Sequence, residues 1–483
     1  MTGLKFIAAL RRSTRSIGTN CSLAAFGLLI SVLLDGCGGL TKSEYQQPTL
    51  DIPGQWRDQH AILDTEMTSG NTIAQHKQWW RSFNDQQLDA LIERALRSNN
   101  DLAAAGIAVY RARLQADLAD TNLTPTVTSQ INARSSPNSN DEVTHGWSTS
   151  TSAQYELDLW GRLARVRDAA AWEATATEYD RQAAALSLIS TTATLYWRIA
   201  YLNELVASTE ASIESARKTL ELVQVRHTAG AVGESEEAQA RTHLASLQAT
   251  LPQQVQQREE ARNALAILFD QSPAHRQMEA KMLALMPMPA LPAALPVDLL
   301  GRRPDLQAAE SRLRESLSNA DAKRLSYYPA LSLSATVETG GTSLTDMLKN
   351  PISTLSSTLL LPFLQWHSAD LTIKTSRAEF DAAALSFKQT FYKALAETQN
   401  AITARGQIAQ TVAQRTTALH EARIAEGLAE VRYRAGKTSL QDWLDSQETR
   451  RQASDQLIKC VDQQYENQMA LYLALGGDMA ARQ

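Results

Sequence analysis

The hexapeptide VRHTAG at residues 225–230 recurs as VRYRAG at residues 431–436, an offset of 431 − 225 = 206. Two further motifs recur in the same order at an offset of 204. DLAAA at residues 101–105 recurs as DLQAA at 305–309, and Pro125, which precedes an alternating stretch, recurs as Pro329. Three matches at nearly one offset indicate an internal duplication whose unit is too long for a solenoid repeat. The chain is therefore predicted to hold two copies of one elongated unit.

Within each copy the order of predicted elements is the same. A helical pattern at residues 88–122, and again at 304–327, ends at a proline and is followed by two strand-like stretches. Residues 162–227 then continue as one helix of about 100 Å, at roughly 1.5 Å per residue. Apolar residues occupy the a and d positions of a heptad in both long helices, which predicts helices that coil around one another: Ile199, Leu202, Val206, Ile213, Leu220 and Val223, then Phe380, Ala384, Phe387, Phe391, Leu395 and Ile402.

Four stretches alternate apolar and polar residues: 126–134, 146–159, 330–339 and 352–361. Each has about the length of a tilted transmembrane strand, which needs roughly 9–11 residues. Four strands cannot close a barrel, because about eight is the observed minimum. Open edges in lipid would leave backbone groups unpaired at a cost of several kcal/mol each. Other copies must therefore complete the sheet, two chains giving about eight strands and three about twelve; the alternative is a pair of soluble hairpins.

The N-terminus has the pattern of a signal peptide at residues 1–36, with basic residues followed by an apolar run at 23–34 that is too short to span a bilayer. The run ends in LDGC (34–37), which resembles a bacterial lipoprotein box. Cleavage before Cys37 would leave its thiol for diacylglycerol and its amine for a third acyl chain such as palmitate. The alternative is a free cysteine. If Cys37 is acylated, Cys460 has no disulfide partner, so packing must hold the fold.

The charge balance and motifs argue against two classes of function. The 483 residues carry 47 Lys+Arg and 52 Asp+Glu, a net charge of −5, and this gives no support for nucleic-acid binding. The eight histidines show no metal-ligand spacing, and the S-x-x-K match at Ser215 and Lys218 lies inside a heptad helix without the companion motifs of acyl-serine enzymes. The sequence therefore predicts neither an enzyme nor a bound cofactor, apart from a covalent lipid on Cys37.

Four motifs spread along the chain resemble the TolC-like outer membrane efflux proteins, specifically their lipoprotein branch, the NodT type: WWRSFND at 79–85, YELDLWGR at 155–162, LGRRPDL at 300–306 and RYRAG at 432–436. The resemblance implies an α+β membrane protein in which four strands from each chain of a homotrimer build a twelve-stranded β-barrel. A long coiled-coil α-barrel continues it across the periplasm. Residues 361–366 (LPFLQW) depart from the glycine-containing turn usual in the family.

The resemblance divides the chain into six segments. They are a signal peptide (1–36), a lipid-anchored and equatorial segment (37–100), a first repeat (101–270), an equatorial insertion (271–299), a second repeat (300–477) and a tail (478–483).

The resemblance also implies a closed gate at the periplasmic tip. Asp442 and Asp445 lie three residues apart, on one face of the last long helix. Threefold symmetry would make them rings of carboxylates, which select cations in channels. The alternative is that both are solvated charges near a helix N-terminus, where the helix dipole favours them.

Glu236 and Tyr433 match positions that link neighbouring helices to keep the gate shut. Thr438 stands where some members carry an arginine, so a latch would come from Arg432 or Arg434, or be absent. Gly230 and Gly436 end helices without steric cost. In the family, such turns dock with a periplasmic adaptor protein, although any helical hairpin would need the same glycines.

The predicted function is a passive exit duct in the bacterial outer membrane for small molecules and drugs. The expected partners are a periplasmic adaptor, an inner-membrane pump of the RND or ABC type and outer membrane lipid. Two alternatives are a type I protein secretion channel and a lipid-anchored coiled-coil scaffold without a pore.

Overall fold

The computed structural model describes residues 41–54, 56, 78–137, 143–285, 288–289, 302–343, 345, 349 and 351–477. The predicted signal peptide, Cys37 and the tail from residue 478 lie outside the described residues. The chain forms two compact units. Unit 1 comprises Met1–Thr49, Val109–Thr177 and Ala309–Phe387, and unit 2 comprises Leu50–Ala108, Glu178–Ala308 and Lys388–Gln483.

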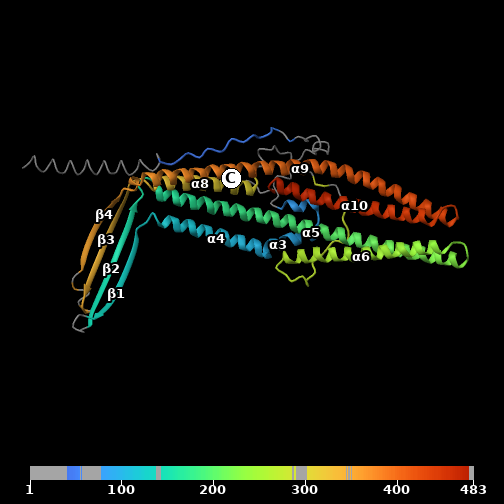
Figure 1. Ribbon diagram of the computed structural model, residues 1–483, viewed down its shortest axis with the longest axis horizontal. Coiled ribbons are helices and arrows are strands. Elements are labelled where there is room, and N and C mark those ends of the chain that lie inside the picture. Colours follow the sequence, from blue (N-terminus) through green and yellow to red (C-terminus); the bar gives the residue numbers. More distant parts are fainter. Residues whose placement is uncertain are drawn as a thin grey trace, which may run out of the picture. The chain divides into compact units, whose positions relative to one another are not determined.

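The elements follow one another in chain order as η2 (Trp79–Phe83), α3 (Gln86–Ser98), α4 (Asn100–Thr121), β1 (Thr126–Pro137), β2 (Val143–Leu157), α5 (Arg162–Thr228), α6 (Glu234–Ile267), α8 (Pro304–Leu325), β3 (Ala330–Gly341), β4 (Ile352–Leu360), η4 (Pro362–Leu364), α9 (Trp366–Arg434) and α10 (Leu440–Ala474). A helix, two strands, a long helix and a return helix can be followed twice along the chain (Figure 1).

The element bounds recur at the offset that the motifs predicted. Helices α4 and α8 both have 22 residues and begin 304 − 100 = 204 residues apart. Strands β1 and β3 both have 12 residues and begin 330 − 126 = 204 apart. Helices α5 and α9 also begin 366 − 162 = 204 apart, while α6 and α10 begin 440 − 234 = 206 apart.

The prediction of one long helix from residue 162 is confirmed, because α5 has 67 residues. Most of its a and d residues are buried, among them Ile199, Leu202 and Val206. Farther along, Ile213 packs with Leu247 of α6, so the heptad face of α5 is covered by the helix that follows it.

The single helix predicted for residues 88–122 is wrong, because Asn99 separates α3 from α4. The backbone of Asn99 is extended, at φ −71° and ψ 126°. Its side-chain oxygen accepts a hydrogen bond from the Leu102 amide at 2.9 Å, as an N-cap residue does. Because the apolar pattern continues across Asn99, it does not indicate that one helix ends and another begins there.

The four strands form one antiparallel sheet in the order β1-β2-β3-β4 within unit 1. The strands predicted for residues 126–134 and 146–159 are longer where they face each other, because β1 extends to Pro137 and β2 begins at Val143. Strand β2 also stops two residues early, at Leu157, because the Asp158 carboxylate accepts the Leu163 and Ala164 amides of α5 at 3.0 and 2.8 Å.

The register places most of the apolar side chains of the four strands on one face of this sheet, while Ile352 and Leu360 of β4 lie on the other. Val127 pairs with Ala153, which pairs with Ala335, which in turn pairs with Leu355. Residues one position away belong to the other face, which is mostly polar: Thr128, Ser152, Thr336 and Thr354 form one such row. Every residue of β4 and nearly every residue of β1 is exposed. The sheet is therefore two-sided, with an uncovered apolar face.

The two strand-to-helix junctions use different backbone geometry. Gly161 enters α5 with a φ of +79°. Its counterpart at the offset of 204 is Gln365, which has a φ of −88° and follows the short helix η4. The absent glycines therefore change the local turn, while α9 still begins at Trp366.

Aromatic side chains from the WWRSFND motif build the main core of unit 2. Trp79 stacks on Tyr472 of α10, with ring centroids 4.2 Å apart. Phe83 packs against Trp197 of α5 at 4.8 Å, and Trp197 packs against Tyr465 at 4.5 Å. This core joins η2, α5 and α10. Among the described residues, no helix has both the length and the apolar character needed to cross a membrane.

Candidate functional site

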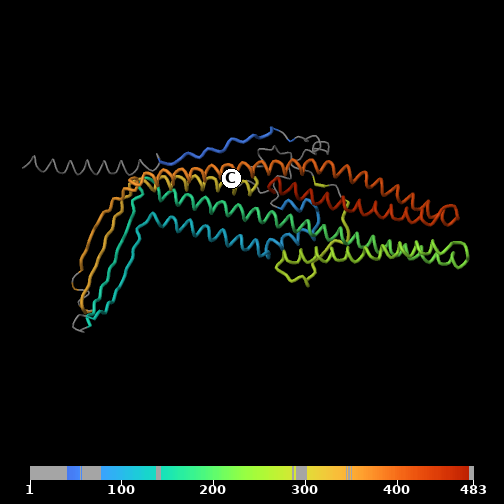
Figure 2. The backbone as a smooth tube through the Cα atoms, viewed as in Figure 1, coloured from blue at the N-terminus to red at the C-terminus, as the bar shows by residue number. Residues whose placement is uncertain are grey.

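The two helix-turn-helix tips of unit 2 have the same backbone. Gly230 and Gly436 adopt φ values of +72° and +70°. The Gly230 amide donates to the His227 carbonyl at 2.9 Å, and the Ala231 amide donates to the Arg226 carbonyl at 2.8 Å. The second turn repeats both bonds around Gly436, at 2.9 Å each. These are the paired bonds of a Schellman C-cap, which glycine adopts without strain (Figure 2, where the first turn is yellow-green and the second red-orange).

A small apolar cluster joins the four helices that meet at these turns. Its buried members come from α5, α6, α9 and α10: Val223, Ala240, Tyr433, Leu440, Trp443 and Leu444. Because each helix contributes at least one side chain, the cluster holds the first tip against the second.

Tyr433 lies at the centre of this cluster and is 2% exposed. Its ring stacks on Trp443 with centroids 5.3 Å apart, and the Arg226 guanidinium lies 4.7 Å from the ring centre. The Tyr433 hydroxyl donates a hydrogen bond to Glu236 Oε2 at 3.1 Å. Burial, reinforced by the Glu236 carboxylate, raises the pKa of this hydroxyl, so it remains a donor at neutral pH.

The structure thus brings together two of the predicted gate residues, Glu236 and Tyr433, from α6 and α9. Arg226 and Trp443 complete the contact and were missed from the sequence. Arg226 also donates from Nη1 to the Tyr433 carbonyl at 3.2 Å. The only signal for these two residues lay in the recurring motif, since both are within a turn or two of the repeated Ala-Gly pair.

The carboxylates of Asp442 and Asp445 are exposed, and both have partners on or beside their own helix. Asp442 Oδ2 accepts from the Ser439 amide at 3.1 Å and from the Ser439 hydroxyl at 2.8 Å. The Asp442 amide donates back to Ser439 Oγ at 3.2 Å, so these residues form a capping box at the start of α10. Asp445 accepts from Gln441 Nε2 at 2.7 Å.

The arginine latch considered from the sequence is not formed in the described part of the chain. Arg434 pairs with Glu430 of its own helix at 2.7 Å. Arg432 is exposed and makes no ion pair with any residue that the structure describes. A different arginine ties α9 to α10, because Arg450 forms an ion pair with Glu426.

The first tip is held by charged groups. His227 of α5 lies 3.0 Å from Glu237 of α6, and Arg241 Nη2 lies 2.6 Å from the other oxygen of that carboxylate. Residues 234–237 form the first turn of α6.

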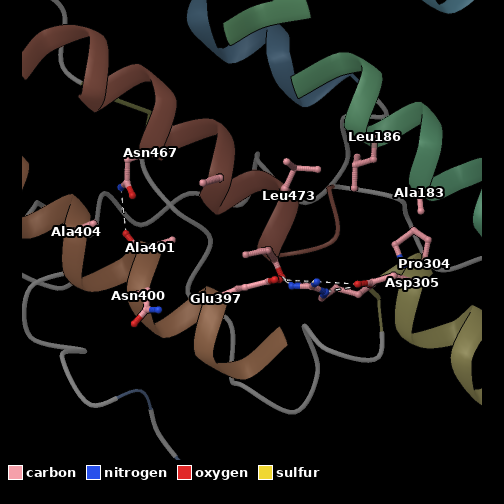
Figure 3. A pocket seen from close by; sticks show the side chains of 13 residues that line it. Ala183, Leu186, Pro304, Asp305, Glu397, Asn400, Ala401, Ala404, Asn467 and Leu473 are labelled. Carbon is pink, nitrogen blue, oxygen red and sulfur yellow. Dashed lines mark hydrogen bonds and ion pairs between the residues drawn. The ribbon is translucent and has the colours of Figure 1, made fainter. Parts of the chain in front are cut away.

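A cavity of about 650 Å³ lies elsewhere in unit 2, where the LGRRPDL motif begins α8 (Figure 3). Its walls come from four helices, with alanines such as Ala401 and Ala474 leaving the space open. The buried Arg303 guanidinium pairs with Asp305 at 2.7 Å and Glu397 at 3.0 Å. The motif therefore joins α8 to α9.

The described residues contain no cluster of three His, Cys, Asp or Glu side chains that could hold a metal ion. Arg303 is committed to two carboxylates, and the Tyr433 hydroxyl is committed to Glu236. The geometry at the tip is suited to holding four helices together or letting them separate.

Comparison with known proteins agrees with this arrangement. The model of the outer membrane efflux protein family matches residues 91–269 and 295–477. A pyoverdine export outer membrane protein of Pseudomonas putida, OpmQ, is 30% identical over 417 residues, covering 84% of this chain and 89% of its own length. Toxin and drug export protein A of Aggregatibacter actinomycetemcomitans is 28% identical, covering 83% of this chain and 88% of its own length.

The solved structure of the outer-membrane channel OprN has a TM-score of 0.81 against this chain, at 25% sequence identity. The match covers 90% of this chain and 98% of that one.

Proposed function

This chain belongs to the outer membrane efflux protein family, and we propose that it is the exit duct through which a tripartite system expels small molecules across the bacterial outer membrane. The names of its relatives support this, since they include pyoverdine export and drug export proteins. The duct is passive, and an inner-membrane pump of the RND or ABC type supplies the energy. A duct of this kind performs no catalysis and needs no cofactor.

The observation that carries the proposal is the four-stranded sheet with one uncovered apolar face. Its edge strands, β1 and β4, are paired on one side only within the chain. In lipid, each unpaired backbone group would cost several kcal/mol, so the edges must pair with other copies. Apolar residues on one face and polar residues on the other are the pattern of a barrel whose outside meets lipid. Three chains would supply about twelve strands and make the homotrimer expected for the family.

Acylation of Cys37 would anchor each chain to the outer membrane, with the helices extending into the periplasm. The tips at Gly230 and Gly436 would meet the hairpin of a periplasmic adaptor. A Cβ at either glycine would meet nothing within 4 Å, which leaves the turns accessible in a single chain.

The tip contacts support a gate that is closed at rest. The Tyr433–Glu236 bond joins the α9–α10 pair to the α5–α6 pair, so separating these pairs breaks it. In a trimer, Asp442 and Asp445 would add rings of carboxylates beside this contact.

Planar bilayer recording of the purified full chain tests the duct. We expect discrete conductance steps together with a trimer in cross-linking and mass measurement. A stable monomer without conductance would instead support the lipid-anchored scaffold and overturn the proposal.

Replacing Asp442 and Asp445 together by asparagine tests the gate separately. We expect a higher leak conductance and weaker cation selectivity, because the fixed negative charge is removed. Gln452→Asn, at an exposed position of α10 that contacts neither aspartate, is the matched control. Unchanged leak and selectivity in a folded trimer would remove both aspartates from the gate and leave the duct itself standing.

Type I protein secretion is the second candidate, and the toxin named among the relatives favours it. The two functions share one duct and differ in the pump. Co-purification with a drug pump or with a protein exporter would distinguish them.

A further inference from the structure

The first described residues of the chain are bound to α8 in unit 1. The Ser43 amide and hydroxyl donate to the two oxygens of Asp321 at 2.8 and 2.7 Å. Arg324 donates to the Thr41 carbonyl at 2.5 Å and to Asp321 at 2.8 Å. Asp321 is 4% exposed, so this carboxylate is a buried clamp for the segment that follows Cys37.

A cavity of about 400 Å³ lies beside this clamp. It is lined by the N-terminal segment, by α5 and by α8: Lys42, Ser43, Glu44, Tyr45, Arg165, Trp172, Arg314, Leu317, Ser318 and Asp321. A water molecule occupies roughly 30 Å³, so the space exceeds that of a few bridging waters. Two aromatic rings and three cationic side chains share its walls, which is a suitable mixture for an amphipathic ligand.

Two arginines of this cavity have N–H groups left over. Arg165 is 9% exposed, and its Nη1 lies 3.0 Å from Asp168 without the alignment of a hydrogen bond. Arg314 lies between two rings, 4.6 Å from the centre of Tyr45 and 4.9 Å from that of Trp172. Its Nη2 pairs with Glu310 at 2.8 Å, whereas its Nε has no acceptor within the described residues. A buried donor without an acceptor destabilises the fold, so an anionic group here would be stabilising.

Lys42 and Glu44 add one charge of each sign to the cavity wall. Both are exposed, and neither forms an ion pair with any part of the chain that the structure describes. Because both side chains line the same cavity, an ammonium and a carboxylate face one space. This pair complements a ligand that carries a phosphate and an amine.

The cavity also lies close to the base of the sheet. Trp160 follows β2, donates from its indole to the Pro329 carbonyl at 2.8 Å, and packs against Tyr328 at 5.4 Å. Aromatic residues of this kind mark the headgroup level of a membrane protein. Arg165 comes only five residues after Trp160 in the sequence.

We propose that this cavity binds the headgroup of an amine-bearing zwitterionic phospholipid of the phosphatidylethanolamine type. The phosphate is bound by Lys42 and the Arg165 and Arg314 guanidinium groups, and the ammonium by Glu44. The site lies beside the segment that follows the acylated cysteine, so a bound lipid and the covalent anchor would fix the same stretch of chain. The proposal rests on the outer-membrane location in the proposed function.

Native mass spectrometry of the full-length protein, delipidated in mild detergent, tests the site. The probes are short-chain phosphatidylethanolamine, phosphatidylglycerol and inorganic phosphate. We expect one phosphatidylethanolamine per chain, bound about tenfold more tightly than phosphatidylglycerol, because one charged hydrogen bond is worth about 1.5 kcal/mol. Lys42→Gln should weaken binding of both lipids, and Glu44→Lys should reverse the preference toward phosphatidylglycerol. Lys323→Gln, an exposed lysine of α8 outside the cavity, is the matched control.

Equal lipid binding in wild type, Lys42→Gln and Glu44→Lys would overturn the proposal. Competition by inorganic phosphate at the concentration that saturates the lipid would also overturn it, and would indicate a site for free phosphate. Bilayer conductance of the same variants separates this proposal from the duct. Lost lipid binding with normal conductance would leave the duct intact, whereas absent conductance in wild type would refute the duct whatever lipid is bound.

Discussion

The two tips of unit 2 have the same turn but opposite chemistry at matching positions. Tyr433 corresponds to His227, and Trp443 corresponds to Glu237, both at the offset of 206. In the first tip this pair of positions is a polar contact between an imidazole and a carboxylate, 3.0 Å apart. In the second tip it is a stack of two buried rings 5.3 Å apart.

The two tips also contribute differently to the contacts between them. Glu236 and Arg226 of the first tip both bind Tyr433 of the second. Their counterparts are Asp442, which caps its own helix, and Arg432, which forms no ion pair within the described residues. The repeats have therefore kept one backbone while one tip supplies the buried aromatic and the other the charged groups around it.

Replacing Trp443 by alanine tests this division with the largest expected effect. Trp443 is 4% exposed in the cluster that joins four helices, and truncating a buried aromatic costs about 3–5 kcal/mol. Denaturant unfolding monitored by circular dichroism measures the loss. Glu237→Ala at the matching position is the control and should change the free energy of unfolding far less. Equal losses at the two positions would contradict the division.

A second asymmetry lies farther along α10, where Asp462 corresponds to the exposed Gln256 of α6. The side chain of Asp462 is 2% exposed and pairs with Arg198 of α5 at 2.7 Å. Burial, partly offset by Arg198, raises the pKa of Asp462 from 3.8 to about 6. Between these two values the folded chain binds the proton and the unfolded chain does not, so stability from this group falls as pH rises.

As the pH rises from about 4 to about 6, the free energy of unfolding of Asp462→Asn should therefore increase by ~2–3 kcal/mol relative to that of wild type, since the asparagine does not ionise. Unfolding free energies across that range, with Gln256→Asn as the control, provide the measurement. A difference between Asp462→Asn and wild type that stays constant with pH would contradict the buried charge.

The order of the long helices and strands could be predicted from the sequence, because the spacing of apolar residues repeats many times along each of them. The heptad of α5 and the alternation of the strands were predicted, and so was the offset that relates the two copies. Each pattern is carried by many residues, so a single residue that departs from it does not change the prediction.

The ends of the helices and strands and the contacts at the tips could not be predicted in the same way. A break at Asn99, the extension of β1 to Pro137 and the capping box at Ser439 each depend on one or two side-chain hydrogen bonds. The stack of Tyr433 on Trp443 also depends on how two helices face one another, which no local pattern specifies. The S-x-x-D spacing at 439–442 was the one local signal available, because it is the pattern of a capping box.

Tyr433→Phe isolates the polar link between the tips from the stack. The ring remains on Trp443 while the hydrogen bond to Glu236 is lost, at about 1.5–3 kcal/mol for a bond to a charged group. We expect this loss in unfolding experiments and a raised leak in bilayer recordings. Glu236→Gln keeps an acceptor and should lose less. If Tyr433→Phe is as stable as wild type, the hydroxyl does not link the tips.

The smallest expected effects come from the N-caps of the two return helices. Ser439 caps α10 with its side chain, whereas Gly233 precedes α6 without a side-chain cap. Ser439→Ala should cost about 1 kcal/mol, while Gly233→Ser should gain a few tenths, since glycine is only slightly poorer than serine at this position. Gly233 has an extended backbone and nothing within 4 Å of a Cβ, so the added side chain fits. Thermal unfolding of both variants compares the two caps. If Ser439→Ala were more stable than wild type, the capping box would not stabilise α10. Asp442 would then make a more favourable interaction outside the box, as in a ring of carboxylates in the assembled duct.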